Sequence, residues 1–176
     1  MRKQMILAVF AFALAGCNQR EESKANTDFL YFDVSGYFKK EAVRLKKLNP
    51  DVTKAVSVNG KIEEKTIKIK DWTKELAIFS NADINKASWK GSFKIEKSNL
   101  LERYTSDNKK IPVKNVSIGK TGNKVNRVEI VISNKNILYS SGDTLVYYPD
   151  SLYEIRKHQK IKLLAQKTYQ ITGKLK

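Results

Sequence analysis

The sequence VNRVEIVIS, residues 125–133, decides the fold class of this chain. Val128, Ile130 and Ile132 recur at every second position, which is the period of a strand with one buried face. Residues 169–175 repeat the pattern near the C-terminus. The spacers between such runs are too short for a parallel connection, which needs a dozen or more residues, so the second half of the chain predicts an antiparallel meander. From Ser88 onward we expect strands over 93–96, 101–104, 111–119, 125–133, 136–141, 144–149, 152–163 and 167–175, with a loop at 106–110 and turns at Gly122-Asn123 and Ser141-Gly142-Asp143.

A helical pattern precedes this region. Asp33 is the expected N-cap, with Phe32 and Tyr37 placed to form a hydrophobic staple, and Asn49-Pro50 is the expected stop. The apolar residues at helical spacing between these signals are Val34, Tyr37, Phe38, Ala42, Leu45 and Leu48.

A hairpin and a shorter helix follow. Asn59-Gly60 is a strong signal for a two-residue turn, because type I′ geometry needs positive φ at both positions. The apolar parity switches between Ile62 and Ile67, which predicts a bulge near Glu63–Lys65. Asp71 is the expected cap of a second helix with Trp72, Leu76 and Phe79 on one face. The expected fold is α+β: an N-terminal helix, a hairpin and a short helix packed on a long antiparallel meander sheet, with a curved half-barrel as one form of that sheet.

The N-terminus has the pattern of an export signal. Arg2-Lys3 precedes ten apolar residues, 5–14, too few to span a bilayer as a helix. Leu14-Ala15-Gly16-Cys17 resembles the lipobox of bacterial lipoproteins. The expected organisation is a lipoprotein signal peptide over residues 1–16, a lipidated flexible tether over 17–28 and a single α+β domain over 29–176.

The resemblance implies acylation of Cys17, which becomes the new N-terminus. Cys17 is the sole cysteine, so no intrachain disulfide can form. Asn18 stands where some Gram-negative bacteria place the aspartate that retains lipoproteins at the inner membrane, which favours the outer membrane. We therefore expect the protein to be lipid-anchored in the outer membrane. The domain can face either the periplasm or the cell surface.

The charge of the mature chain is strongly positive. Removing Arg2 and Lys3 with the leader leaves 32 basic against 18 acidic side chains, a formal net charge of +14. The export signal argues against nucleic acid as the partner. Attraction to anionic lipid, contact with an envelope protein and an ordinary solvated lysine-rich surface remain open, and the oligomeric state is undetermined.

Short matches to catalytic motifs do not assemble into a site. Ser106-Asp107-Asn108 and Lys120-Thr121-Gly122 match two motifs of serine β-lactamases, but no Ser-x-x-Lys precedes them. Lys114 stands where a P-loop ending at Lys120-Thr121 requires glycine. His158, the sole histidine, lies among basic residues and is expected to face solvent. Asp143 and Asp150 are expected in turns, and Glu63-Glu64 alternate faces. We therefore expect no catalytic residue, no metal site and no cofactor.

Aromatic residues are the remaining functional signal: Trp72, Trp89, Tyr139, Tyr147, Tyr148, Tyr153 and Tyr169. They either pack the core or partly line a cavity for a lipophile. The size of the chain, its expected membrane localisation and the order of its elements are similar to those of the half-barrel carriers that receive lipoproteins at the outer membrane. The expected function is a non-catalytic binding module of the envelope; the alternatives are a lipophilic-ligand or lipoprotein carrier with a cavity between sheet and helices, and a basic module docking on anionic envelope components.

Overall fold

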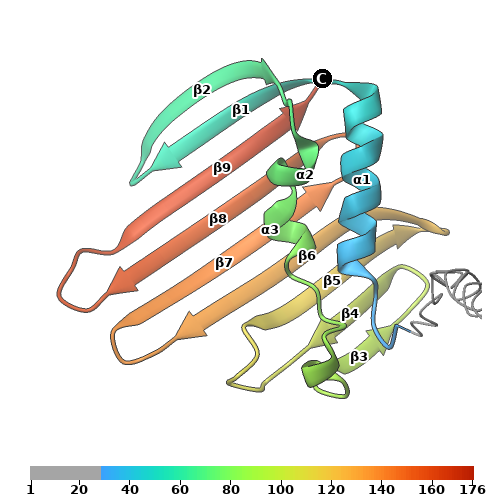
Figure 1. The fold of residues 1–176 in the computed structure, drawn as a ribbon, viewed down its shortest axis with the longest axis vertical. Helices are drawn as coiled ribbons and strands as arrows, with labels where there is room; N and C mark the ends of the chain where they lie inside the picture. Colours follow the sequence, from blue (N-terminus) through green and yellow to red (C-terminus); the bar gives the residue numbers. More distant parts are fainter. Residues whose placement is uncertain (1–28) are drawn as a thin grey trace, which may run out of the picture.

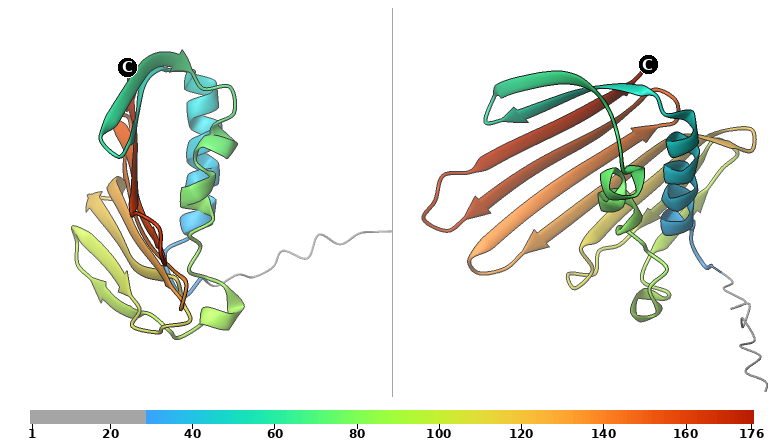
Figure 2. Two further views of the ribbon diagram at one scale, coloured as in Figure 1. Left: turned by 90° about the vertical axis from the view of Figure 1, so that its left-hand side faces the viewer. Right: turned by 45° about the horizontal axis from the view of Figure 1, so that its top comes forward.

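A computed structural model describes residues 29–176 as an antiparallel sheet with helices on one face (Figure 1). The predicted α+β class is confirmed. Figure 2 shows the sheet and the helices as two layers, with the sheet curved and not closed into a barrel. The predictions for the signal peptide, Cys17 and the tether lie outside the described residues. Within the described part, no helix is long and apolar enough to cross a bilayer.

The helical elements are α1 (Val34–Leu48), α2 (Trp72–Glu75), α3 (Ala77–Ser80) and the 3₁₀ turn η1 (Ala87–Trp89). The strands are β1 (Asp51–Val58), β2 (Lys61–Lys68), β3 (Lys94–Lys97), β4 (Leu101–Thr105), β5 (Val113–Thr121), β6 (Lys124–Lys135), β7 (Tyr139–Tyr148), β8 (Leu152–Ile161) and β9 (Lys167–Leu175).

Strands β3 to β9 form the predicted meander. The N-terminal hairpin of β1 and β2 extends the sheet beside β9, the last strand of the chain. The order across the sheet is β2-β1-β9-β8-β7-β6-β5-β4-β3. Strand β1 pairs antiparallel with β9, with Val52 opposite Leu175 and Val58 opposite Tyr169. The edge strand β2 has five charged residues among its eight, three lysines and two glutamates, a composition that discourages pairing with another chain.

Helix α1 begins and ends where the sequence predicts. The Asp33 carboxylate accepts a hydrogen bond of 2.8 Å from the backbone N–H of Gly36, which caps the helix. The rings of Phe32 and Tyr37 form the predicted staple, with centroids 5.6 Å apart. Asn49 adopts a left-handed conformation with φ 48° and ends the helix before Pro50.

The second helical segment is capped by Asp71 as predicted, and it is divided. The Asp71 carboxylate accepts from Lys74 N–H at 3.0 Å. Trp72, Leu76 and Phe79 are buried as expected. Leu76 has φ −92° and ψ 6°, so the backbone leaves the α-helical region there and separates α2 from α3.

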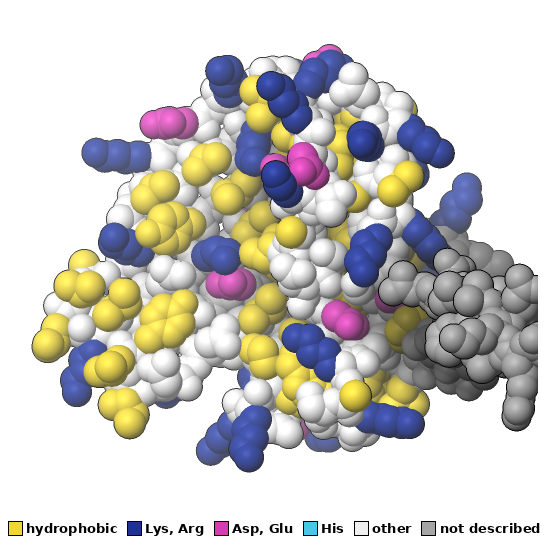
Figure 3. Space-filling view, in the orientation of Figure 1, with side chains coloured by type: hydrophobic (Ala, Val, Ile, Leu, Met, Phe, Trp, Pro, Cys, Tyr) yellow, Lys and Arg dark blue, Asp and Glu magenta, His cyan; other side chains and the backbone are white. Residues whose placement is uncertain are grey.

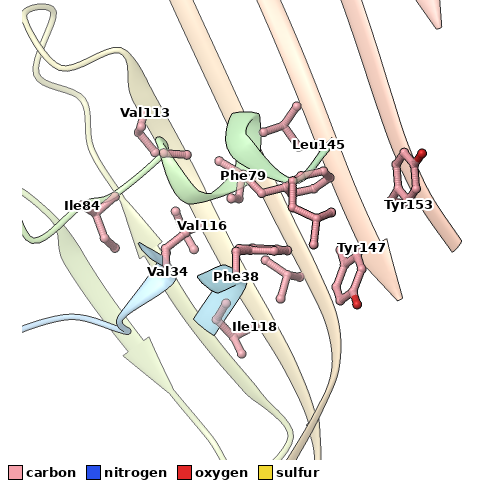
Figure 4. Close-up of a cluster of buried hydrophobic side chains, with 14 of the residues drawn as sticks. Val34, Phe38, Phe79, Ile84, Val113, Val116, Ile118, Leu145, Tyr147 and Tyr153 are labelled. Atoms are coloured by element: carbon pink, nitrogen blue, oxygen red, sulfur yellow. The ribbon is translucent and has the colours of Figure 1, made fainter. Parts of the chain in front are cut away.

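The core lies between these helices and the inner face of the sheet, the face toward α1 (Figure 4). Phe38 of α1 contacts Phe79 of α3 at 4.8 Å between ring centroids and Tyr147 of β7 at 5.3 Å. Strand residues that alternate inward complete the cluster: Tyr104, Val116, Ile118, Val128, Ile130, Leu145, Tyr147 and Tyr153. The opposite, outer face is predominantly polar.

The prediction of a turn at Ser141-Gly142-Asp143 is wrong. Strand β7 continues through these residues, paired with Gln159, His158 and Lys157 of β8. Gly142 is a glycine because the His158 ring covers it: an added Cβ would lie 2.2 Å from the ring. Asp143 forms an ion pair with Lys157 at 3.3 Å across the two strands, so its expected place in a turn is also wrong. Asp150 does lie in a turn, with φ 61°.

Two smaller predictions also fail. The hairpin around Asn59-Gly60 forms, but β1 and β2 pair in unbroken register, so the bulge near Glu63–Lys65 is absent from this pair. Ile62 instead points to the outer face and is exposed, which explains the parity switch without an extra residue. Leu48 is 59% exposed although its spacing placed it on the buried face; Leu45, three residues earlier, is the last fully buried residue of α1.

Candidate ligand-binding recess

The helices cover only one end of the inner sheet face. In Figure 1, α1, α2 and α3 cross the right-hand and central parts of the strands, while the left-hand parts of β7, β8 and β9 carry no helix. We call the part beneath the helices the covered end. The open end consists of the inward-facing residues beyond them: Val56, Val58, Tyr139, Lys157, Gln159, Ile161 and Tyr169.

A recess of about 500 Å³, open to solvent, lies at the boundary between these two ends. Its lining comes from α2, α3, β1, β8 and β9: Lys54, Lys74, Glu75, Ile78, Ile155, Lys157, Gln159, Tyr169 and Ile171. The space-filling view shows apolar side chains at the bottom of this hollow and charged groups around it (Figure 3).

The strand register explains why apolar and polar residues lie together here. Ile155 of β8 is opposite Ile171 of β9, and two positions further along each strand Lys157 is opposite Tyr169. Positions two apart point to the same face, so all four side chains project toward the helix layer. Ile78 of α3 closes the side nearest the core. The recess therefore has an aliphatic floor with a tyrosine and a lysine where the cover ends.

Charged groups at the recess are paired with one another. Lys54 of β1 donates to Glu75 of α2 at 2.6 Å, and the same carboxylate oxygen accepts a hydrogen bond from the Tyr153 hydroxyl. Lys157 pairs with Asp143, and Lys74 is 3.6 Å from Asp71. The rim is thus close to electroneutral and surrounds an apolar floor.

Among residues 29–176, three groups combine a tyrosine, a glutamate and a cation in this way, and Tyr153–Glu75–Lys54 is the first. Tyr147 donates to Glu41 at 2.5 Å, and Glu41 pairs with Arg44 at 2.8 Å. In each group a buried phenol from the sheet satisfies a half-buried carboxylate that also contacts a cation. The third group consists of Tyr104, Glu102 and Lys120.

These contacts fix the tyrosines in their neutral form. Burial raises the pKa of Tyr153 above its ordinary value, and the hydrogen bond to Glu75 and the charge of that carboxylate raise it further. The pKa of Tyr147 is raised by burial and then by Glu41 in the same way. For Tyr104 the order of causes is again burial and then Glu102. The phenols act as hydrogen-bond donors to the carboxylates of Glu41, Glu75 and Glu102.

The arrangement supports binding by surface complementarity. Open apolar recesses with a few oriented polar groups hold ligands through buried area, with polar contacts setting the orientation. Within residues 29–176, no group of three or more histidine, cysteine or acidic side chains is placed to hold a metal ion. His158 is exposed on the outer face of β8, as the sequence predicted, away from the recess.

The residues singled out from sequence are dispersed. Ser106-Asp107-Asn108 lies between β4 and β5, and Lys120-Thr121-Gly122 spans the turn between β5 and β6. The aromatic set divides between the core, the recess and other positions. Trp72, Tyr147 and Tyr153 are core residues, and Tyr169 lines the recess. Trp89, Tyr139 and Tyr148 lie at intermediate or exposed positions elsewhere.

Sequence reasoning missed Lys54, Lys157 and Ile78 as recess residues. A signal was present in β8, where the inward positions change from apolar Tyr153 and Ile155 to polar Lys157 and Gln159. Such a change along one face marks the point where the cover over a sheet ends. Comparison with protein-family models, curated proteins and solved structures found no match to this chain.

Proposed function

We propose that this chain is an outer-membrane lipoprotein, anchored through Cys17, whose domain is a non-catalytic binding module for a lipophilic group such as an acyl chain. The recess beside α2 and α3 is the proposed binding site. One observation carries the proposal: a cover that stops short of the sheet end leaves an aliphatic floor open to solvent, formed by Ile78, Ile155 and Ile171.

The position of the recess distinguishes this proposal from a carrier with a cavity beneath its helices. Under α1 and α3 the space is filled by the rings of Phe38, Phe79 and Tyr147. A ligand therefore lies beside the helices, along β8 and β9, with one side still in contact with water. Such a site fits a single chain of a lipid or an acylated peptide, which can enter and leave without opening the core.

Binding of a fluorescent fatty acid to the purified full-length protein tests the site. Tyr169→Ser removes an apolar side chain from the recess wall and leaves the core untouched. We expect it to weaken binding by roughly tenfold, since burying a large apolar side chain contributes about 1.5–3 kcal/mol and 1.4 kcal/mol is a factor of ten. The matched control is Tyr148→Ser, on the outer face of β7. Equal affinities for the two variants would contradict the proposed site.

Membrane fractionation tests the anchor separately. Cys17→Ser removes the thiol that acylation requires. We expect loss of palmitate labelling and a shift of the protein out of the membrane fraction. Unchanged fractionation would contradict the proposed localisation while leaving the recess proposal intact.

A further inference from the structure

Two hairpin turns at the open end of the sheet expose aliphatic side chains to solvent. The turn between β6 and β7 carries Ile137 and Leu138, and the turn between β8 and β9 carries Leu163 and Leu164. Ile137 is 89% exposed and Leu163 is 96% exposed. Exposed aliphatic side chains are ordinary singly, whereas four on adjoining turns form a patch that calls for a partner.

The two turns form one surface. The backbone N–H of Lys162 donates to the carbonyl of Leu138 at 2.8 Å, which ties the second turn to the first. Tyr139 pairs with Ile161 directly behind them, and Ile161 is also exposed. In Figure 1 both turns project from the same end of the sheet, beyond the helices. We call these residues, 136–138 and 161–166, the aliphatic tip.

All charged residues around the aliphatic tip are basic. Lys135, Lys160, Lys162 and Lys167 flank its two turns, and residues 133–140 and 159–168 contain no aspartate or glutamate. The corresponding corner of Figure 3 shows yellow and dark blue side chains. The nearest acid along β7, Asp143, is paired with Lys157.

The backbone at the tip gives an independent observation. Leu163 has φ 70°, in the left-handed region that glycine and asparagine adopt readily and that other residues adopt uncommonly. A leucine at this position is unfavourable for two reasons: its backbone has positive φ, and its apolar side chain is exposed to water. Backbone strain of this kind clusters at functional sites, which makes this turn a candidate contact surface.

From these observations we propose that the aliphatic tip inserts into the headgroup region of an anionic lipid bilayer. Aliphatic side chains surrounded by lysines match that environment, since apolar groups enter the acyl boundary while ammonium groups contact phosphates. A protein partner fits less well: the cores of protein interfaces are enriched in aromatic residues and arginine and depleted in lysine, the reverse of this tip. The insertion is a second membrane contact, distinct from the anchor and from the recess.

Site-specific fluorescence on the full-length acylated protein in vesicles tests this proposal. Leu163→Cys introduces a thiol that can be labelled with an environment-sensitive nitrobenzoxadiazole dye, and wild-type protein treated identically gives the background from Cys17. We expect emission to rise roughly threefold and shift to the blue in phosphatidylglycerol-containing vesicles, with a smaller response in pure phosphatidylcholine or at high salt. The matched control is Leu100→Cys at the β3–β4 turn, where Leu100 is 69% exposed and no change is expected.

A second variant tests whether the turns act together. Adding Ile137→Ser to Leu163→Cys should reduce the emission change, because the two turns lie on one surface. Equal emission at positions 163 and 100 in anionic vesicles would overturn the proposal. So would a signal at position 163 that appears without vesicles and depends on protein concentration, since that result would assign the tip to a second copy of the chain.

Discussion

The two ends of the inner sheet face share one set of strands and differ in what covers them. At the covered end the inward strand residues Ile130, Leu145 and Tyr147 are fully buried, and rings from α1, α3 and β7 fill the space. At the open end the same strands present Lys157, Gln159 and Tyr169, and they finish in turns that expose Ile137 and Leu163. The comparison indicates that the covered end provides stability, whereas the open end is available for binding.

Truncating one aromatic residue at each end tests this division most strongly. Phe38→Ala, at the covered end, should lower the free energy of unfolding by about 3–5 kcal/mol, because it removes a fully buried ring from a packed cluster. Tyr169→Ala, at the open end, should cost less than about 1 kcal/mol, because its ring already faces water on one side. Urea titration followed by circular dichroism measures both. Equal losses would mean that the open end is also structural core.

Removing the carboxylate at the boundary should have the next largest effect. Glu75→Ala leaves the buried Tyr153 hydroxyl and Lys54 without their acceptor, and the expected loss of stability is about 1–3 kcal/mol. Glu64→Ala on the exposed strand β2 is the control and should change stability by less than about 0.5 kcal/mol. Thermal unfolding compares the two. A neutral Glu75→Ala variant would show that the three-residue group contributes no net stability.

The buried tyrosines of the covered end predict sensitivity to alkali. Their pKa values are raised in the folded protein, so their contribution is complete below the ordinary tyrosine pKa of about 10 and is lost as the pH rises above it. Above that pH, stability should fall by up to about 1.4 kcal/mol per pH unit for each such tyrosine. Tyr153→Phe should flatten this slope by about one such increment. Unfolding titrations of the variant and the wild-type protein at a series of alkaline pH values measure the slopes; identical slopes would contradict the assignment.

The smallest expected effect is a gain at the aliphatic tip. Leu163→Asn places a residue that tolerates positive φ where the backbone has φ 70°, and it removes an exposed leucine. We expect the free energy of unfolding to rise by about 0.5–1 kcal/mol, the usual size of a backbone-compatible substitution. Leu164→Asn in the same turn is the control, with no expected gain. A destabilised Leu163→Asn variant would show that the leucine packs against the fold.

Local signals predicted those elements whose boundaries are set by neighbouring residues. Asp33 and Asn49-Pro50 delimit α1 because capping and helix termination depend on backbone groups within one turn. Asn59-Gly60 fixed the first hairpin for the same reason. Gly142 led to a wrong turn prediction because glycine occurs in turns and also in strands where a neighbouring side chain lies close to the backbone. The sequence does not show that the His158 ring lies over Gly142.

Features that depend on distant residues could not be predicted in this way. The pairing of β1 with β9 joins residues more than a hundred positions apart, and no local pattern specifies which edge of the meander receives the hairpin. The recess depends on where α2 and α3 end over the sheet, so Lys54 and Ile78 carried no signal as neighbours of Tyr169. Leu138 and Leu163 of the tip looked like strand residues, because strands were expected over 136–141 and 152–163.

Photolabelling with a diazirine fatty acid tests most directly whether the open end binds a lipophilic group. The full-length protein is irradiated with the probe, and the modified residues are mapped by peptide mass spectrometry. We predict labels on the inward residues of β8 and β9, at Ile155, Tyr169 and Ile171, with unlabelled fatty acid competing for them. Labels confined to Leu163 and Leu164, or spread over the outer face without competition, would contradict a binding site in the recess.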